Sequence, residues 1–487
     1  MAVRARLTPP RTPKTDWPWH RVKASSLKAT LLFGGGRRME AENFLASGFG
    51  TRIAIEAKAA GWTRLADVAR TWQPHRLKGI QVSPEFGTPF LAATQVYDVR
   101  PVPRKWLSLA RTGDHAQRFV KQGTILVTCS GSVGRATLAD ATIKDILISH
   151  DLLRIDAIDP DWWGWIYAYL RAPTVREMMK AAQYGHIIKH LETHHLDALP
   201  IVHVGPQQLG AFNTMAKSVL AKRDRAYRLM LEAEDLFLKA FGEFAPDDMG
   251  ETGFSARASE VFGTARRRLD AWHHNPSAKA IAAHMGKRAV AWSSITDLGF
   301  DVWLPTRFRR IAAEDGVYFL DSSDLFEINP DITKRIADKD FGDPYDGRVR
   351  QGWILLSRSG QIYGLNGSAM IAGHCHEGKV ISDHIIRIAP NEPKCRTGYL
   401  LMAMTHPTLG RPRVKCLPYG SSIPEIEVFD AQGFQIPRLE PSMEAEIANR
   451  VEEAARLRDE ADEIETQLGE GADAAIGEFL AHKSVGA

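Results

Sequence analysis

The chain of 487 residues repeats itself once, with the second copy displaced by about 230 positions. Matching residues keep the same order through each half, and the displacement drifts only slightly. It is 230 from Trp62 to Trp292, 229 from Gly123 to Gly352, and 237 from Pro200 to Pro437. A sequence with such an internal period folds into repeated units rather than one large core. We therefore expect a tandem of two similar structures.

Each copy begins with a segment of mixed character. In residues 33–204 and 266–438, short β-branched runs such as 124–128 and 354–357 alternate with turns rich in Gly, Ser and Pro. A helical pattern covers residues 163–180. Period-two runs between turn residues are typical of strands. The predicted fold class is α+β, with two mixed α/β domains in tandem, separated by two long helices that form an antiparallel coiled coil.

The predicted helices occupy residues 205–245 and 439–482, with a linker at residues 246–265. Their apolar residues recur in steps of three and four, interrupted at Arg223 and Arg450. The predicted seam consists of Leu209, Phe212, Val219, Met230, Phe237, Ile447, Leu457, Ile464 and Leu468. Neither helix can bury such a stripe alone. The first helix is basic and the second acidic, which favours pairing with each other; the alternative is that each docks only on its own domain.

The N-terminal segment has a different composition. Residues 1–38 contain nine Lys and Arg but one acid, Asp16, and are interspersed with prolines. We interpret residues 1–32 as a basic flexible arm, which either lies along DNA phosphates or has no role. No apolar run is long enough to span a membrane, and no secretory signal is evident. The four cysteines are scattered, which fits a reducing cytoplasm.

Several paired sequence blocks carry a family resemblance. They are residues 123–134 and 352–364, Ile148-Ser149 and Ile381-Ser382, the run from Gly185 to Pro200 that leads through Pro206 into the first long helix, and Arg268-Leu269-Asp270-Ala271 with its looser counterpart at residues 38–41. In this order the blocks resemble the specificity subunit of type I restriction–modification systems. The sequence departs from that family at Pro441-Ser442-Met443-Glu444, where Pro-x-x-Gln is expected, and in its longer basic arm.

The resemblance implies a subunit that is not itself an enzyme. Each domain would recognise one half of a split target in double-stranded DNA. The helices would set the distance between the halves and dock two DNA methyltransferase subunits. No cofactor is expected in this chain, because S-adenosylmethionine would be bound by the methyltransferase. ATP-dependent restriction subunits are further candidate partners in a cytoplasmic antiviral defence complex.

Two loop regions of each domain are candidate DNA contacts, because Arg, Lys, Gln and Ser side chains can reach base edges or phosphates. We call residues 130–135 and 358–363 the Ser-Gly turns, and residues 184–190 and 413–422 the Tyr-Gly segments. The candidates are Ser130, Ser132, Arg135, Tyr184, His186, Lys189, Arg358, Ser359, Gln361, Tyr363, Lys415, Tyr419 and Ser421. The alternative is that the glycines only form tight turns and the basic residues are solvated surface.

Two other function classes remain open. The run Phe33-Gly34-Gly35-Gly36 superficially resembles a cofactor loop, so one alternative is a single-chain DNA methyltransferase with a divergent loop. The other is a scaffold whose recognition domains are degenerate. Asp343-Pro344-Tyr345 and His374-Cys375-His376 are better interpreted as surface loops than as methyltransferase or metal motifs. No GxxxxGK[ST] phosphate loop occurs, so ATP-driven translocation is not expected from this chain.

Overall fold

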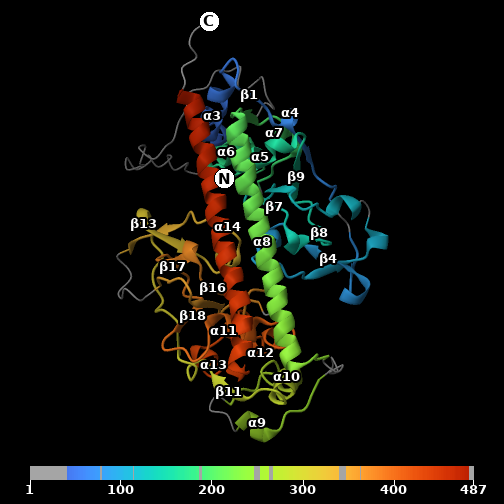
Figure 1. The fold of residues 1–487 in the computed structure, drawn as a ribbon, viewed down its shortest axis with the longest axis vertical. Helices are drawn as coiled ribbons and strands as arrows, with labels where there is room; N and C mark the ends of the chain where they lie inside the picture. The colour runs from blue at the N-terminus through green and yellow to red at the C-terminus, as the bar shows by residue number, and fades with distance from the viewer. Residues whose placement is uncertain are drawn as a thin grey trace, which may run out of the picture.

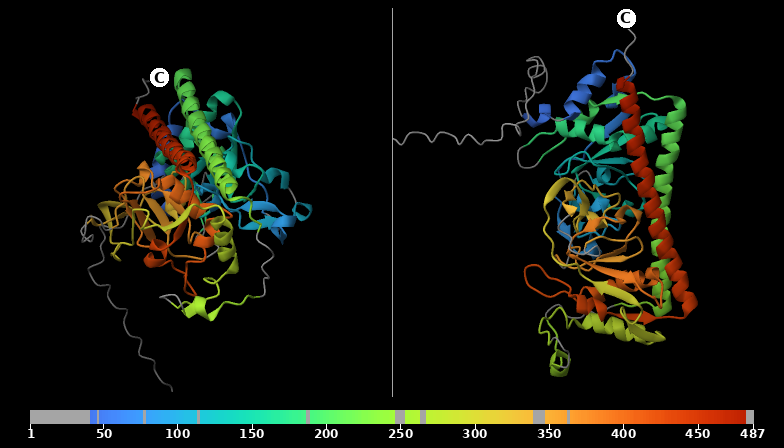
Figure 2. Two further views of the ribbon diagram at one scale, coloured as in Figure 1. Left: turned by 60° about the horizontal axis from the view of Figure 1, so that its bottom comes forward. Right: turned by 90° about the vertical axis from the view of Figure 1, so that its left-hand side faces the viewer.

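The computed structural model describes residues 41–45, 47–76, 79–112, 115–185, 189–245, 253–262, 267–338, 347–361 and 364–481. Two mixed α/β bodies, which we call head 1 and head 2, lie on the same side of two long helices (Figures 1 and 2). The predicted arm at residues 1–32 lies outside the described residues, as do His186, Tyr363, the glycine run at residues 33–36 and Asp343-Pro344-Tyr345. Among the described helices, none is long and apolar enough to cross a membrane.

Head 1 is built around a four-stranded sheet of order β2-β9-β6-β7. Its strands and helices are α2 (Ala41–Leu45), α3 (Ser47–Glu56), β1 (Trp62–Arg64), α4 (Leu65–Val68), β2 (Ala69–Trp72), β3 (Gln81–Val82), β4 (Thr88–Leu91), β5 (Lys105–Leu107), β6 (Ile125–Thr128), β7 (Ala136–Leu138), β8 (Leu147–Ile148), β9 (Leu152–Ala157), α5 (Trp163–Arg171), α6 (Pro173–Ala182), α7 (Thr193–Asp197) and β10 (Pro200–Val202). Strand β6, predicted from its β-branched run, is buried along its whole length.

Head 2 has a four-stranded sheet of the equivalent order, β12-β18-β15-β16. Its elements are α9 (Ala258–Phe262), α10 (Pro276–Gly286), β11 (Ala291–Ser294), β12 (Phe300–Trp303), β13 (Ala312–Leu320), β14 (Arg335–Ile336), β15 (Ile354–Ser357), β16 (Ala369–Ile371), β17 (Val380–Ile381), β18 (Ile385–Pro390), α11 (Thr397–Thr405), α12 (Arg411–Val414), α13 (Val428–Gln432) and β19 (Gln435–Arg438). The central strand β15 is again fully buried. The mixed helix and strand content agrees with an α+β class.

The helical pattern at residues 163–180 forms two helices instead of one. Helix α5 ends at Arg171, and α6 begins at Pro173 after Ala172 adopts a non-helical conformation. Proline cannot donate the backbone hydrogen bond that a continuous helix needs at this position, but it is well tolerated at the first position of a new helix. The predicted helical stretch is confirmed, and Pro173 is the physical reason that it is divided into two helices.

The two long helices, α8 (Pro206–Phe241) and α14 (Pro441–Ala481), lie side by side and run in opposite directions (Figure 1). The ion pairs between them fix the direction. Lys222 pairs with Glu460, and Arg450 Nε lies 3.5 Å from Glu232 Oε2. Residue numbers therefore increase along α8 in the direction in which they decrease along α14. These pairs join the basic helix to the acidic one, as the charge difference in the sequence suggested.

Each long helix contributes to the cores of both heads. The C-terminal half of α8, from Ala226 to Phe241, packs in the core of head 2, and residues 461–476 of α14 pack in the core of head 1. Of the predicted seam residues, six are buried and three are partly buried. The buried ones are Val219, Met230, Phe237, Ile447, Leu457 and Leu468, and the partly buried ones are Leu209, Phe212 and Ile464. The stripe therefore faces the other long helix and the heads together.

Arg223, which interrupts the apolar stripe of α8, carries a buried ion network. Its Nη2 atom lies 2.8 Å from Glu465 Oε2 and 3.2 Å from Asp462 Oδ1 on α14. Asn329 of head 2 donates its side-chain amide to Glu465 at 2.7 Å, and Arg171 of head 1 lies 3.5 Å from the same carboxylate. The network joins both helices and both heads, so the charged residue has a structural purpose that periodicity alone did not reveal.

The heads also contact each other through equivalent segments of the repeat. The Val99 amide donates to the Phe326 carbonyl at 2.8 Å, and the Ile328 amide donates to the Tyr97 carbonyl at 2.7 Å. Tyr97 and Phe326 are 229 positions apart, as are Val99 and Ile328. The contact is thus reciprocal, like a contact across the two-fold axis of a symmetric dimer.

Replacing Val219 by Asp tests the importance of helix burial. Val219 is completely buried on α8, so the new carboxylate would have no water and no partner. We expect Val219→Asp to lower the free energy of unfolding by about 3–5 kcal/mol, measured by urea denaturation. The matched control is Leu231→Asp on the same helix, at a side chain that is 43% exposed; it should change stability by no more than about 0.5 kcal/mol. Equal losses in both variants would contradict the assigned buried face.

Candidate functional site

In head 1 the Ser-Gly turn and the Tyr-Gly segment meet. Ser130 forms a β-bridge with His190, which also bridges to Tyr184. The Ser130 hydroxyl lies 3.1 Å from His190 Nδ1 and donates to Asp151 Oδ1 at 3.3 Å. The Tyr184 hydroxyl donates to the Glu192 carboxylate, which raises the pKa of Tyr184. Two segments that are more than fifty positions apart therefore form one surface region.

Head 2 has the same arrangement. Ser359 forms a β-bridge with Glu425, which also bridges to Tyr419. The Ser359 hydroxyl donates to Glu425 Oε1 at 2.9 Å and lies 3.0 Å from His384 Nδ1. The Tyr419 hydroxyl donates to Glu427 at 2.5 Å. The two heads thus present equivalent sites built from equivalent positions of the repeat.

The acid and the imidazole exchange places between the two sites. The Cys129 amide donates to the Asp151 carbonyl in head 1, just as the Arg358 amide donates to the His384 carbonyl in head 2, so Asp151 and His384 are equivalent. The other partner of each serine is His190 in head 1 and Glu425 in head 2. Each serine therefore contacts one carboxylate and one imidazole, but on opposite sides. The turn is held in the same way while its charge pattern is reversed.

Sequence reasoning missed three of the four partners of the serines. Asp151, His384 and Glu425 belong to no recognised motif, whereas His190 is the last residue of the Tyr-Gly segment in head 1. The repeat contained the signal, since His190 and Glu425 are 235 positions apart and Asp151 and His384 are 233 apart, within the drift of the other matches. In both pairs an acid in one copy of the repeat corresponds to a histidine in the other. The contacts with Ser130 and Ser359 show why these residues exchange places.

Arg135, which the sequence predicts as a DNA contact, is bound inside the protein. Its guanidinium pairs with Glu327 of head 2 and donates to the Ile328 carbonyl at 2.9 Å. It also lies over the Tyr97 ring, 4.0 Å from the centroid. Only 11% of the side chain is exposed. The residue after the turn therefore joins the two heads instead of facing an external ligand.

Two further cations predicted to face DNA are engaged in loop packing. Arg358 Nη2 lies 2.7 Å from Glu425, its Nε donates to the Ile426 carbonyl at 3.2 Å, and 17% of its side chain is exposed. Lys415 donates to the carbonyl groups of Gly364 and Asn366, and burial lowers its pKa to about 7. A cation whose donors are occupied and partly desolvated is poorly placed for phosphate. The structure thus shows Arg358 and Lys415 packed against their own loops.

The remaining candidates lie at the tips of the loops. Ser132, Gln361 and Ser421 are exposed, and Tyr419 is 39% exposed. Gln361 donates to the Ser422 carbonyl at 3.3 Å, so the two loops of head 2 also contact at their tips. Lys189 is partly buried, and its carbonyl accepts from the Gly131 amide at 3.3 Å. Polar side chains on rigidly held loops are suited to bind an external ligand.

A metal site is not evident among the described residues. In the described ranges, no three or more His, Cys, Asp and Glu side chains gather as a metal site would require. His376, from the motif at residues 374–376, is buried, and this burial lowers its pKa to about 4. Its ring nitrogen accepts from the Gly373 amide at 3.1 Å. This histidine therefore supports its own loop.

The chain is similar to several solved structures of restriction–modification proteins. The S subunit of the type I system from M. genitalium has 12% identity, with 88% of this chain and 98% of that chain covered and a TM-score of 0.31. The HsdS subunit from Thermoanaerobacter tengcongensis has 14% identity, coverage of 86% and 95%, and a TM-score of 0.24. A chain from a structure of type I complex assembly and conformational transition has 14% identity, coverage of 86% and 97%, and a TM-score of 0.27.

A type IIG restriction endonuclease, BpuSI, is similar over a smaller part, 36% of this chain and 28% of that chain, with 10% identity and a TM-score of 0.28. No protein-family model matches the sequence. No curated protein matches it either.

Replacing Arg135 by Ala tests its assignment to the contact between heads. The change leaves Glu327 without its cation, and burial already raises the pKa of this carboxyl. We expect Arg135→Ala to cost about 3 kcal/mol of stability at pH 8. The loss should be smaller at pH 5, because a Glu327 whose pKa rises further binds a proton there and becomes neutral.

The matched control is Arg64→Ala, which removes an exposed pair with Asp67 and should change stability by no more than about 0.5 kcal/mol. Unfolding is measured by urea denaturation at both pH values. A loss for Arg135→Ala that is independent of pH would refute the role of Glu327.

Proposed function

We propose that this chain is the sequence-specific DNA-recognition subunit of a type I-like restriction–modification or related defence complex. The observation that carries the proposal is the pair of equivalent loop sites, one in each head, that share a backbone arrangement and differ in side chains. Two heads that recognise different half-sites need a common fold and different contact residues. Duplex DNA is the extended ligand that suits two fixed heads, since the half-site spacing follows from the protein dimensions.

The exposed loop tips are the proposed base contacts. Gln361 in head 2 can pair with adenine through its amide, and Ser132 in head 1 can donate to or accept from either base edge. Tyr419 and Ser421 belong to the Tyr-Gly segment of head 2, which contacts the turn that carries Gln361. They would contact the sugar and phosphate backbone. Arg135, Arg358 and Lys415 would act indirectly, by holding the loops that carry these residues.

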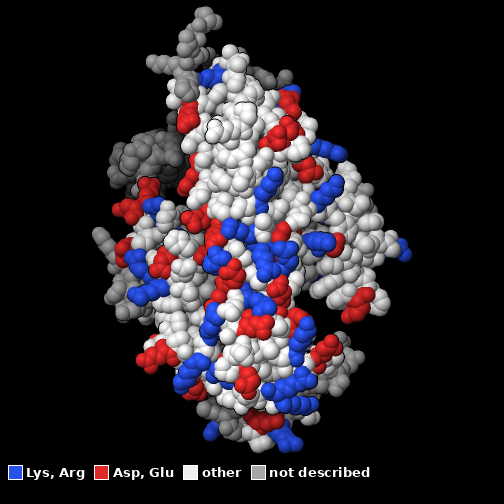
Figure 3. Space-filling view, viewed as in Figure 1, with Lys and Arg blue, Asp and Glu red and all other residues white. Residues whose placement is uncertain are grey.

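The two long helices are proposed to act as an antiparallel coiled-coil spacer. Their ion pairs and shared cores support a fixed separation between the heads. Near the start of α8, residues 206–216 carry no charge, and Figure 3 shows a largely uncharged patch at this end of the molecule, bordered by charged residues, while the middle of the helix pair is highly charged. We propose the helix pair as the docking surface for two DNA methyltransferase subunits, which would bind S-adenosylmethionine.

The experiment that tests this function is methylome sequencing. Cells that express this chain together with the methyltransferase encoded beside it are compared with cells that express the methyltransferase alone. A split, two-part motif that is methylated only when this chain is present supports the proposal. If no new motif appears although the methyltransferase copurifies with the chain, the scaffold alternative is favoured. Saturable binding of labelled S-adenosylmethionine by the isolated chain would favour the single-chain methyltransferase alternative.

Single substitutions at the loop tips should separate the two half-sites. We expect Gln361→Ala to relax one half of the methylated motif and Ser132→Ala to relax only the other half, with a loss of about 1–3 kcal/mol of discrimination for a bidentate contact. Glu85→Ala, an exposed change outside both loop sites and both long helices, is the control and should leave the motif unchanged. If both loop variants alter the same half, the assignment of one half-site to each head is wrong.

A further inference from the structure

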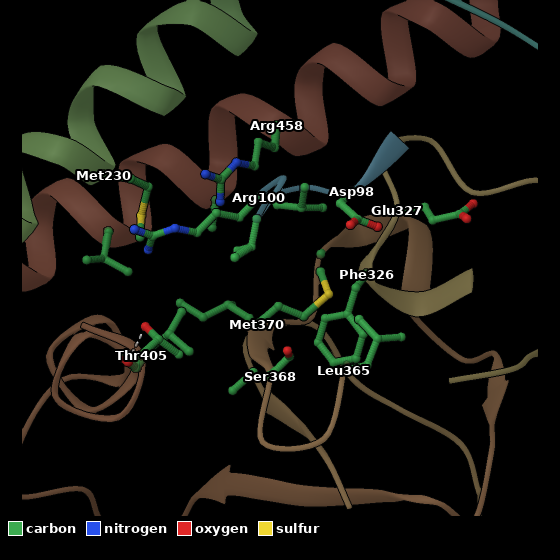
Figure 4. Close-up of a pocket in the computed structure, with 18 of the residues that line it drawn as sticks. Asp98, Arg100, Met230, Phe326, Glu327, Leu365, Ser368, Met370, Thr405 and Arg458 are labelled. Carbon is green, nitrogen blue, oxygen red and sulfur yellow. Dashed lines mark hydrogen bonds between the residues drawn. The ribbon is translucent and has the colours of Figure 1, made fainter. Parts of the chain in front are cut away.

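A cavity of about 150 Å3 lies where the two heads meet the middle of the long helices (Figure 4). It is about ten times larger than the space that one water molecule requires. Four arginines contribute to its lining, namely Arg100, Arg104, Arg411 and Arg458. Phe326, Leu365 and Met370 form an apolar part of the wall. The site therefore combines positive charge with an apolar surface.

The internal repeat gives this cavity a counterpart on the other side of the reciprocal contact between the heads. At this counterpart, which we call the filled side, ion pairs occupy the volume that is empty in the cavity. Arg223 lies 2.8 Å from Glu465 and 3.2 Å from Asp462, and Arg176 lies 2.6 Å from Asp331. Arg135 completes this filled side by pairing with Glu327, as described above. The two sides can be compared position by position.

Arg458 of α14 is the counterpart of Arg223 of α8. The two helices align with a displacement of 235, because Gly164 of α5 packs against the backbone of Asn213 just as Gly398 of α11 packs against that of Ala448. With this displacement Arg458 corresponds to Arg223.

The same alignment identifies what Arg458 has lost. The carboxylates Asp462 and Glu465 that bind Arg223 correspond to Tyr227 and Met230. Met230 lines the cavity. The cation is retained on this side, but both of its acids are missing.

Arg411 is the counterpart of Arg176. Gly134 packs against Met179 in head 1 and Gly367 packs against Val414 in head 2, which again gives a displacement of 235. The acid that binds Arg176 is Asp331, and its counterpart is Val102, because the Tyr97 and Phe326 segments align at 229. Val102 lines the cavity. Here too the arginine is retained and its carboxylate is absent.

Ser368 is the counterpart of Arg135. The Thr128 amide donates to the Arg135 carbonyl at 2.9 Å, and the Ser357 amide donates to the Ser368 carbonyl at 2.8 Å. The guanidinium that fills the space beside Tyr97 therefore has no equivalent beside Phe326. The short serine side chain leaves part of the volume that forms the cavity, and Asp98, the counterpart of Glu327, lacks the matching cation.

The carboxylates that line the cavity do not balance the arginines. Glu327 and Asp462 are bound by the arginines of the filled side, and Asp459 accepts from the His374 amide at 2.5 Å. Burial raises the pKa of Asp98 to about 7, so about half of this group is neutral near that pH. The amide hydrogen bond does not cancel the charge of Asp459, so Asp459 and part of Asp98 stand against Arg104, Arg411 and Arg458, and the cavity has more cations than anions.

The arginines stay positive. Arg100 pairs with Glu234, while neither Arg411 nor Arg458 forms an ion pair in the described part of the chain. Burial lowers the pKa of Arg458 to about 10, which still leaves the group protonated at neutral pH. Both arginines therefore line the cavity without a directly bound carboxylate, while Asp140, Asp462 and Glu234 act on the charge of Arg458 from farther away. A ligand anion in the cavity would supply the missing direct partner.

We propose that the cavity between the heads binds a small phosphate-bearing anion. A phosphate group would take the place of the carboxylates that the filled side supplies from Asp331, Asp462 and Glu465. Guanidinium groups match phosphate oxygens in geometry and charge. The apolar wall at Phe326 and Met370 would accommodate an organic group attached to the phosphate. Because the ligand would touch both heads and both helices, it would join the same four parts that the filled network joins.

The proposal is tested on the full-length chain by calorimetric titration and thermal unfolding, with inorganic phosphate or AMP as the ligand and chloride at matched ionic strength as the reference. We expect saturable binding and a higher Tm with at least one ligand. Tighter binding of AMP identifies a nucleotide as the source of the phosphate, and equal or tighter binding of inorganic phosphate identifies the free anion. Absence of saturable binding for both ligands overturns the proposal.

Variants connect binding to the cavity. Arg411→Gln and Arg458→Gln should each weaken binding at least tenfold, corresponding to about 1.4 kcal/mol. Met230→Glu restores the carboxylate of the filled side, so it should also weaken binding at least tenfold while the Tm in chloride stays the same or rises. Arg456→Gln, an exposed change on the same helix in a residue that pairs with Glu453, is the control and should bind like the unaltered chain. Unchanged binding in Arg411→Gln and Arg458→Gln overturns the proposal even if Met230→Glu does not fold.

Discussion

The structure depends on one burial constraint, which is that neither long helix can cover its apolar stripe alone. Helices α8 and α14 solve this by packing against each other and by inserting one end into each head. Apolar burial of this kind is the main favourable term in folding. The relative position of the two heads is thus determined by the cores themselves, and the ion pairs of Arg223 and Lys222 set the register of the helices on this basis.

Duplication followed by divergence explains how similar halves acquired different tasks. Positions that determine the fold, such as the buried strands β6 and β15, kept their character. Positions at the loop sites changed in a compensated way, because an acid and a histidine exchanged places around each serine. At the junction of the heads the charges are not compensated in this way. Arg458 and Arg411 have arginine counterparts in the other copy of the repeat, but Met230 and Val102 stand where that copy has carboxylates.

The repeat, the class of fold and the extents of both long helices could be predicted from the sequence, because period and hydrophobic spacing are local signals. The pairing of the two helices agreed with their charges, because Lys222 lies on the basic helix and Glu460 on the acidic one. The apolar pattern at residues 163–180 predicts helix but not its division, which occurs at Pro173.

The candidate site was less accessible from the sequence. Ser132, Gln361 and Ser421 are exposed loop residues, as expected. Arg135 and Arg358 have the right chemistry for DNA, yet the structure pairs them with Glu327 and Glu425. Whether a cation faces solvent or an internal acid is decided by tertiary contacts, and no single-residue property reveals it.

The sharing of the cores has a consequence for the order of events during protein synthesis. The core of head 1 includes residues 461–476 of α14, which are synthesised only after head 2. Domains generally fold as units from the N-terminus as the chain emerges. Here head 1 must wait for α14, whereas head 2 needs only residues up to about Leu457. The N-terminal half of the nascent chain would therefore remain incomplete longest, and it would depend most on protection by chaperones.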